Sequence, residues 1–266
     1  MKKNLGYIVI GAIFFGISMI PKLDTINGLN MVTWTVFGLC VAKVTIAYGL
    51  FITNERKKYV YEHFNEEFRV SFAYIFRIIL SNKEFLLIKG RNKKYQPVGG
   101  VFQYSENTIA YWKKLGFTND GTGELYDFRG TVKGKNVLKF LKKIKSGKNR
   151  ENTCYREFDE EIVKNIKTNK QLFDKETLKF EYLKTSYLYG REQFYTQPNR
   201  MNIYMVYNVD LSENQDIELL NLVKTSSKFE TFKKIQISCL GMDIAVNNHE
   251  PTINEHTKYI LYEEDI

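Results

Sequence analysis

The stretch that decides the fold runs from Gly147 to Val163 and reads GKNRENTCYREFDEEIV. Near its end stand three glutamates, Glu157, Glu160 and Glu161. On a helix, this spacing places the three carboxylates on one face within a single turn. Carboxylates this close repel one another unless a cation lies between them, and oxygen-rich clusters suit Mg²⁺ or Mn²⁺. The alternative interpretation is a solvated acidic helix face without a ligand.

This stretch resembles the second half of the Nudix signature. Arg156 starts the pattern of an arginine, a glutamate, an apolar residue, any residue and two glutamates, and Gly147 takes the place of the preceding glycine. Phe158 falls on the opposite side of the predicted helix, where it can anchor the helix in a core. Upstream, PVGGV at residues 97–101 resembles the turn that begins the Nudix box, with its paired Gly99 and Gly100.

The resemblance has departures that bear on activity. Lys148 stands where the family has a glutamate, Ile162 and Val163 replace the usual Thr-Gly, and about 46 residues separate Gly100 from Gly147. A working Nudix hydrolase commonly needs carboxylates from both halves of the box to hold cations and activate water. A lysine at position 148 would neutralise the site without a metal or contact a phosphate, which favours binding over turnover.

Composition and charge narrow the functional class. The chain has 266 residues, of which 44% are hydrophobic, and this length allows one sizeable core with an appendage. A net charge of +9 favours partners that carry phosphate or an anionic surface. The three cysteines, Cys40, Cys154 and Cys239, have no paired spacing, which indicates a reducing compartment.

Residues 1–53 differ from the rest of the chain. Residues 5–20 are uncharged and apolar, and residues 29–53 carry a single charge, so the pair predicts a two-span transmembrane hairpin joined by a short turn. A cleavable signal peptide is the alternative for the first segment, but no small-x-small cleavage site follows it. Basic residues flank both spans, which predicts that both termini are cytoplasmic.

Three residues of the second predicted span bear on helix association. Lys43 is central, and a charge at that depth usually faces a bundle interior or water. Gly38 and Ala42 form a small-xxx-small pair, which allows helix backbones to approach closely. Together they modestly favour helix association, within the hairpin or between chains.

The remaining chain reads as a connector over residues 54–69 and a Nudix-like domain over residues 70–266. Strand patterns cover residues 70–80, 85–89, 95–104, 124–132, 180–189 and 202–209, and we expect the first two to form a hairpin. Helical patterns cover residues 107–115 and 216–223. The predicted fold class is a membrane-anchored α/β protein, with the hairpin followed by a Nudix-like α/β/α sandwich built on a mixed sheet.

Residues 133–150 hold basic residues without an acid, and their apolar residues recur at helical spacing. This predicts an amphipathic basic helix that leads into the acidic one. Lys142, Lys143 and Lys145 on it are candidate phosphate contacts; a solvated face or a lipid-headgroup contact is the alternative.

A two-span hairpin followed by an insertion-bearing Nudix domain is similar to one family, the transmembrane–Nudix effectors of CBASS anti-phage systems, also described as SMODS-associated Nudix proteins. The resemblance implies a sensor of a cyclic oligonucleotide made by a cGAS-like nucleotidyltransferase. It also implies a homo-oligomer of the bacterial inner membrane that disrupts the lipid bilayer and kills the infected cell. The expected ligand contacts are Arg156, Lys148, the three helix lysines and the glycine pair, with Mg²⁺ a possible cofactor on the three glutamates. No DNA or RNA duplex is expected as a partner.

Two further hypotheses remain open at this stage. One is a membrane-anchored, Mg²⁺-dependent Nudix hydrolase of nucleoside diphosphate derivatives, which would release a mononucleotide product. The other is a structural membrane protein without a ligand, which would show no nucleotide-induced thermal shift.

Overall fold

The computed structural model describes residues 35–36, 39–40, 54–121, 126–191, 199–239 and 252–261. No helix within these ranges is long and apolar enough to cross a membrane. This finding overturns the membrane-anchored part of the predicted fold class and the predicted two-span inner-membrane location. The predicted spans, with Gly38, Ala42 and Lys43, lie outside the described residues apart from positions 35–36 and 39–40.

The chain separates into two compact units, residues 1–62 and 63–266. In the first unit, helix α3 (Glu55–Glu62) falls where the sequence predicts a connector, and an exposed ion pair between Lys58 and Glu62 links its successive turns. The second unit carries every strand and helix discussed below.

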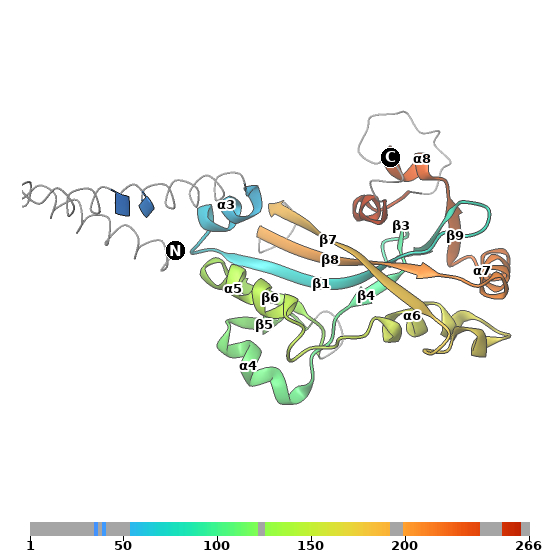
Figure 1. Cartoon of the computed structure of the whole chain (residues 1–266), viewed down its shortest axis with the longest axis horizontal. Coiled ribbons are helices and arrows are strands. Elements are labelled where there is room, and N and C mark those ends of the chain that lie inside the picture. The colour runs from blue at the N-terminus through green and yellow to red at the C-terminus, as the bar shows by residue number, and fades with distance from the viewer. Residues whose placement is uncertain are drawn as a thin grey trace, which may run out of the picture. The chain divides into compact units, whose positions relative to one another are not determined.

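The main sheet of the second unit is mixed, as predicted. Its central strand β1 (Glu67–Arg77) runs parallel to β8 and antiparallel to β4 and β6. The strand order is β5-β6-β1-β8-β7, with β4 paired to the second half of β1 (Figure 1). The other strands are β4 (Gly99–Val101), β5 (Phe117–Asn119), β6 (Arg129–Lys133), β7 (Lys179–Arg191) and β8 (Asn199–Asp210).

A second, smaller sheet has the order β3-β2-β9, formed by β2 (Phe85–Lys89), β3 (Tyr95–Pro97) and β9 (Phe229–Phe232). The predicted hairpin between residues 70–80 and 85–89 is therefore wrong, because its two strands belong to different sheets. Among the described residues, the two predicted segments share only one isolated antiparallel bridge, between Ile79 and Phe85. The chain leaves the main sheet after β1 and starts the second sheet at β2.

Alternating residues of β1 separate the two faces of the main sheet, as the two-residue period of a strand requires. Phe72 and Phe76 point to one face, where they contact Phe140 of α5 (Gly134–Lys145) and Phe158 of α6 (Tyr155–Glu161) at ring distances of 5.7 and 5.6 Å. Figure 1 shows both helices on that face. Phe158 is fully buried, which confirms its predicted role as the anchor of the acidic helix.

The opposite face of the main sheet packs on the small sheet. Ala73 and Ile75 of β1 share a core cluster there with Leu87 of β2, Phe232 of β9 and Ile260. Helix α8 (Lys234–Ser238) and the 3₁₀-helix η5 (Glu255–Ile260) complete this layer. The mixed α/β fold fits the predicted Nudix-like domain, although a small sheet with short helices takes the place of one expected helical layer.

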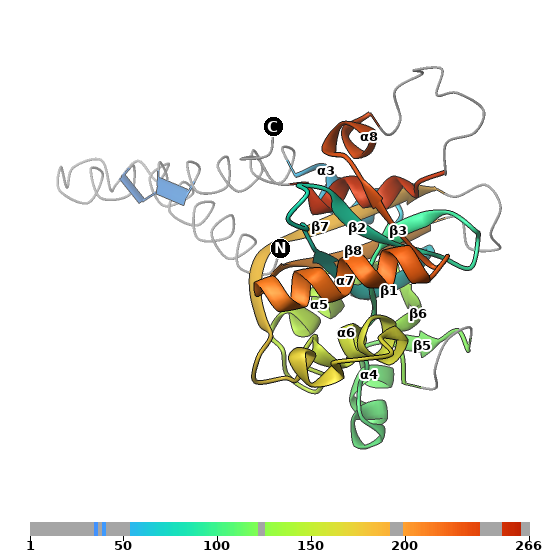
Figure 2. The same ribbon diagram turned by 90° about the vertical axis from the view of Figure 1, so that its right-hand side faces the viewer.

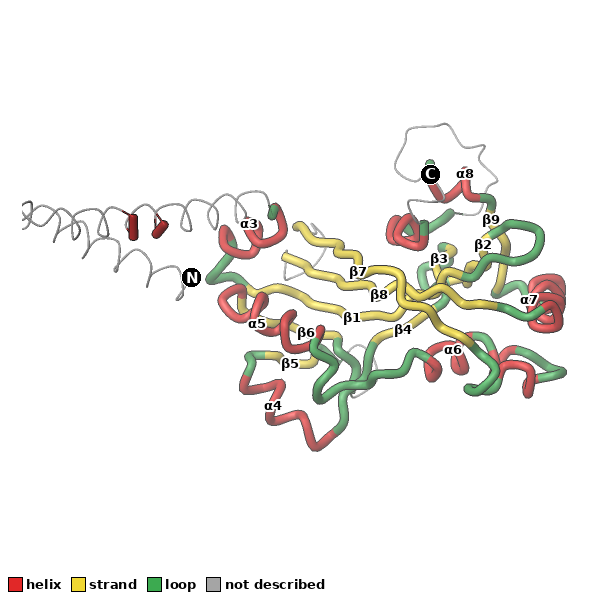
Figure 3. Tube along the Cα trace, viewed as in Figure 1, coloured by secondary structure: helices red, strands yellow, loops and turns green. Residues whose placement is uncertain are grey.

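Helix α7 (Glu213–Thr225) extends the predicted segment 216–223 at both ends and packs beside β9 (Figure 1). In Figure 2 it is the orange helix seen side-on. Ser212 begins it with a capping box, in which its hydroxyl accepts from the backbone of Gln215 while the Gln215 side chain accepts from Ser212. The predicted helix 107–115 is confirmed as η2 (Glu106–Thr108) and α4 (Ile109–Lys114). Figure 3 sets these helices against the two sheets. Two further 3₁₀-helices follow α6, η3 (Val163–Asn165) and η4 (Lys170–Phe173).

The basic helix α5 ends earlier than its predicted limit at residue 150. The backbone N–H groups of Ser146 and Gly147 bond to the carbonyls of Lys143 and Ile144. Gly147 adopts φ +73°, the left-handed conformation that commonly ends a helix at a glycine. Residues 146–154 therefore connect α5 to α6 as a non-helical link.

Candidate functional site

A cleft of about 630 Å³ lies where β4, α6 and the small sheet meet. Its backbone side includes Gly99 and Gly100 of β4, and its polar side includes Asn92 and Gln96 near β3. The charged side chains that line it are four carboxylates and five cations: Asp127, Glu157, Glu160 and Glu161, with Lys89, Arg91, Arg129, Arg156 and Lys228. Residues far apart in the sequence are thus brought to one mixed-charge surface.

Arg156 is the centre of the acidic helix's contacts. Its Nη1 donates to Oε2 of Glu160 at 2.9 Å, and its Nη2 also contacts the carboxylate of Glu157. Its Nε and Nη2 form a two-point contact with Glu151, each at 3.0 Å. Nη2 also donates to the carbonyl of Val101 in β4 at 3.0 Å. One guanidinium therefore joins three carboxylates and ties α6 to the main sheet.

Burial and charge act in opposite directions on this cluster. Burial lowers the pKa of Arg156, but the hydrogen bonds to Glu151 and the charges of Glu157 and Glu160 outweigh it, so that this pKa is raised. Burial raises the pKa of Glu157 to about 7, against the opposing effect of Arg156. Glu157 is 5% exposed and is the most enclosed of the three glutamates that the sequence proposes as metal ligands.

The glycine pair explains how Glu157 comes so near the sheet. A Cβ atom at Gly100 would lie 1.7 Å from Oε2 of Glu157, so no larger residue fits with the carboxylate in place. Gly99 has φ +150°, and a Cβ there would lie 2.1 Å from the backbone oxygen of Tyr74. Both glycines line the cleft, and both allow a close approach that side chains would prevent.

Glu161 has a different partner from the other two glutamates. Its Oε2 accepts a hydrogen bond from Nζ of Lys228, just before β9, at 3.1 Å. Each of the three helix glutamates is thus paired with a basic side chain of the protein. Within the described ranges, no group of three or more His, Cys, Asp or Glu side chains is arranged to hold a metal ion. The arrangement therefore does not match a preassembled three-carboxylate metal site.

The lysines predicted as phosphate contacts do not lie together in the cleft. Lys142, Lys143 and Lys148 are exposed, and none of them lines the cleft. Lys145 is also exposed and lines a separate cavity against the main sheet. Of the predicted site residues, the cleft brings together Gly99, Gly100, Arg156 and the three glutamates of α6.

Several residues in or beside the cleft were not predicted from the sequence. Glu151 supplies a carboxylate to Arg156, and its Oε2 also accepts from the backbone N–H of Gln103 at 3.2 Å. It stands three positions after Lys148 and holds Arg156 without lining the cleft itself. Lys89, Arg91 and Arg129 come from β2, the loop after it and β6, and no spacing in the sequence links them.

Comparison with known proteins identifies the family of the chain. Residues 67–261, about three quarters of the chain, match the family model for the SMODS-associated NUDIX domain. The matched region runs from β1 to the end of η5 and so includes both sheets and the cleft. No curated protein and no solved structure shows a significant match to the chain. The predicted resemblance to the Nudix effectors of CBASS-type systems is confirmed at this level, and the chain belongs to the SMODS-associated NUDIX family.

Proposed function

We propose that the chain is the ligand-sensing effector of a CBASS-type anti-phage system, and that its cleft binds the phosphates of a cyclic oligonucleotide. The family supports the link to signalling by cGAS-like nucleotidyltransferases. The cleft supports the class of ligand, because its size falls in the usual range for small-molecule sites.

The charge pairing in the cleft is the observation that carries this proposal. Arg156 and Lys228 are engaged by the glutamates of α6. Lys89, Arg91 and Arg129 line the same cleft and form no ion pair with any described carboxylate. Three cations that face a cleft and form no ion pair among the described residues attract an anionic ligand, and guanidinium groups match phosphate geometry well.

The same pairing favours binding over hydrolysis. Metal-assisted hydrolysis uses carboxylates to hold cations and to activate water. Here each of the three glutamates of α6 is already paired with Arg156 or Lys228. A ligand would thus meet a surface with net positive character rather than an open carboxylate cluster.

A Mg²⁺-dependent hydrolase of nucleoside diphosphate derivatives is the second candidate, and Glu157 is the observation that favours it. A carboxyl group whose pKa is raised to about 7 is matched to general-base catalysis near neutral pH. Nudix domains generally use divalent metals. Mg²⁺ often binds through one or two carboxylates together with substrate phosphates, so we propose that any Mg²⁺ enters with the ligand.

The test is a thermal-shift screen of the full chain against cyclic di- and trinucleotides and linear nucleoside diphosphate derivatives, with and without Mg²⁺. A ligand at 100 times its dissociation constant stabilises the folded state by about 2.7 kcal/mol. Chromatography of the same incubations then separates the candidates, since an intact ligand indicates sensing and a mononucleotide product indicates hydrolysis. Light scattering on ligand-free and ligand-bound samples tests the predicted homo-oligomer.

Two lysines offer a matched pair of variants for this screen. Lys89 lines the cleft, whereas Lys142 is equally exposed on α5 and does not. We expect Lys89→Glu to reduce the ligand-induced shift and Lys142→Glu to leave it unchanged. Absence of a shift with every cyclic oligonucleotide would sink the sensing proposal.

A further inference from the structure

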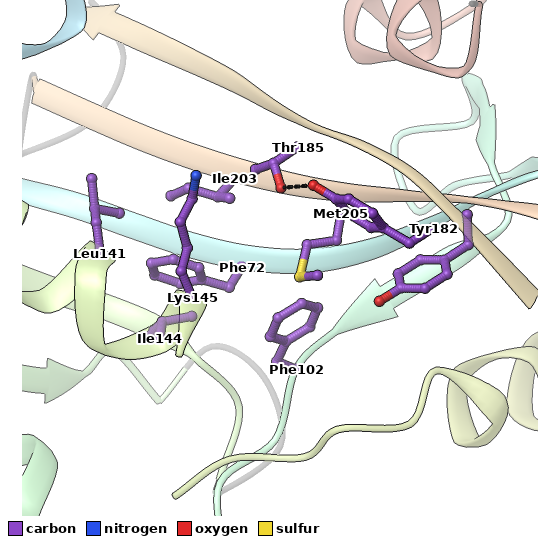
Figure 4. Close-up of a pocket in the computed structure, with 10 residues that line it drawn as sticks. Phe72, Phe102, Leu141, Ile144, Lys145, Tyr182, Thr185, Ile203 and Met205 are labelled. Atoms are coloured by element: carbon purple, nitrogen blue, oxygen red, sulfur yellow. Dashed lines mark hydrogen bonds between the residues drawn. The ribbon is translucent and has the colours of Figure 1, made fainter. Parts of the chain in front are cut away.

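A second cavity, of about 240 Å³, lies on the helix-bearing face of the main sheet. Its floor is formed by strands β1, β8 and β7, and the last turns of α5 form one wall (Figure 4). It lies beside β7, the edge strand of the sheet, where Tyr182 is 50% exposed. None of its lining residues belongs to the cleft.

Aromatic rings dominate the lining of this cavity. Phe72, Phe102, Tyr182 and Tyr207 contribute rings, and Met205 adds a polarisable thioether. Tyr182 and Tyr207 meet edge to face at 5.6 Å, and the Tyr182 hydroxyl shares a hydrogen bond of 2.8 Å with Thr185. These contacts fix the orientation of Tyr182 although half of the residue is exposed. A pocket of rings with one fixed at its edge suits a planar aromatic ligand.

The charged groups around the cavity are basic. Lys145 lines it, with Nζ 4.9 Å from the ring centre of Tyr187. The guanidinium of Arg150 lies over the Phe102 ring at 4.6 Å, and its Nη2 contacts the Met205 sulfur at 3.9 Å, a weak acceptor. Among the described residues, no acidic side chain lines this cavity. A ligand with a negative charge is therefore complementary to it.

We propose that this cavity, which we call the α5–β7 cavity, is a second binding site of the chain and takes a nucleotide whose base lies among the rings. The base contacts the half-exposed ring of Tyr182 and only the edge of Phe102, which already packs against Tyr74 and Arg150, and the phosphate lies at the mouth beside Lys145. For scale, a cavity of roughly 150 Å³ lined by apolar side chains holds a benzene ring, so this one has room for a larger ring system. Stacking on aromatic side chains contributes about 1–3 kcal/mol per base.

The α5–β7 cavity shares no lining residue with the cleft, although two neighbouring residues, Arg150 and Glu151, contact one site each. Arg150 contacts the lining of the α5–β7 cavity, and its Nε donates to the carbonyl of Ile144 at 2.8 Å. Its neighbour Glu151 holds Arg156 in the cleft. A nucleotide in the cavity requires no ligand in the cleft, so this proposal stands or falls separately from cyclic-oligonucleotide sensing.

Calorimetric titration of the full chain with adenosine monophosphate, adenosine and ribose 5-phosphate tests the proposal. Adenosine monophosphate should bind, adenosine more weakly, and ribose 5-phosphate least, because the base supplies the main contacts. Tyr182→Ala should weaken adenosine monophosphate binding at least about fivefold, from the loss of one stacking ring. Tyr182→Phe keeps the ring and loses only the hydrogen bond to Thr185, so it should weaken binding less than Tyr182→Ala does. Thr185→Phe should abolish binding by filling the cavity.

Charge variants supply the matched control. Lys145→Gln should weaken adenosine monophosphate about two- to fivefold, as expected for an exposed charge pair, and Lys142→Gln should have no effect. Lys89→Glu in the cleft should also leave this affinity unchanged. No binding of adenosine monophosphate, or binding that neither Tyr182→Ala nor Thr185→Phe changes, would overturn the proposal. Loss of binding in Lys89→Glu alone would assign the nucleotide to the cleft and equally reject it.

Discussion

Gly100 and Glu157 lie so close that a Cβ atom on the glycine would be 1.7 Å from Oε2 of the carboxylate. The two residues come from separate elements, β4 and α6, and both line the cleft. The missing side chain at position 100 is what lets the acidic helix rest on the strand. The glycine pair and the glutamates of the signature are therefore one structural unit.

Gly100→Ala should lower the free energy of unfolding by about 1–3 kcal/mol, the usual range for overpacking a buried contact. The added methyl group displaces the Glu157 carboxylate, and with it the contact to Arg156. Urea denaturation of the full chain measures this loss. The double variant with Glu157→Ala removes the collision, so its loss should be smaller than the sum of the two single losses. Strict additivity would show that the two side chains do not compete for space.

Glu157 should make the stability of the domain depend on pH. Its folded-state pKa of about 7 is above the ordinary value of 4.5, mainly because of burial. The protonated form thus favours the folded state, and this contribution is fully present below pH 4.5 and is lost as the pH rises through 7. Glu157→Gln should remove that part of the slope, so its stability should change less between pH 4.5 and 7 than that of the wild type. Urea midpoints at a series of pH values for both proteins would reveal parallel curves if Glu157 does not titrate in this range.

Arg156 should be hard to replace, even by another cation. Its guanidinium reaches Glu151, Glu157, Glu160 and the carbonyl of Val101 together, which the point charge of a lysine does not reproduce. Removing one partner of a buried ion pair destabilises by about 3–5 kcal/mol, so Arg156→Leu should fall in or near that range and Arg156→Lys below it. Urea denaturation gives both values. Equal stability of wild type and Arg156→Leu would contradict a structural role for the guanidinium.

The Arg156→Leu variant also tests the possible cofactor. If the glutamates bind Mg²⁺ once the Arg156 guanidinium is removed, Mg²⁺ should raise the melting temperature of Arg156→Leu more than that of the wild type. Ca²⁺ serves as the matched control ion, because it prefers more oxygen ligands than the cluster offers. An equal, small response of both proteins to Mg²⁺ would count against these carboxylates as metal ligands.

The parts predicted from the sequence are those set by local chemistry. The acidic helix, its Phe158 anchor and the glycine pair follow from spacing within short segments, and all three lie together in the structure. The parallel pairing of β1 with β8 joins Phe68 to Asn199, and no local pattern encodes a contact over that separation. The predicted β1–β2 hairpin failed for the same reason, since strand patterns do not say which sheet a strand joins.

The sequence analysis named part of the cleft lining, and the residues that it missed have a physical explanation. Glu151 belongs to a non-helical link in which Gly147 and Asn149 have positive φ values, so helical spacing misplaces its side chain. The cleft-lining cations Lys89, Arg91 and Arg129 come from segments that only tertiary packing brings together. Basic residues clustered in sequence, such as Lys142 and Lys143, were the more visible signal, yet they lie outside the cleft.

The last prediction separates these two groups of cations. Arg129 lines the cleft and forms no ion pair with a described carboxylate, whereas Lys143 is exposed on α5 away from the cleft lining. Arg129→Glu should weaken cyclic-oligonucleotide binding about tenfold or more, because a hydrogen bond to a charged group contributes about 1.5–3 kcal/mol. Lys143→Glu carries the same change in net charge and should leave the affinity within about twofold, since exposed charges more than a Debye length apart are largely screened. Titration calorimetry at two salt concentrations measures both effects, and raised salt should weaken the wild type more than Arg129→Glu. If Lys143→Glu instead caused the larger loss, the ligand would bind along the basic helix and the cleft would not be the sensing site.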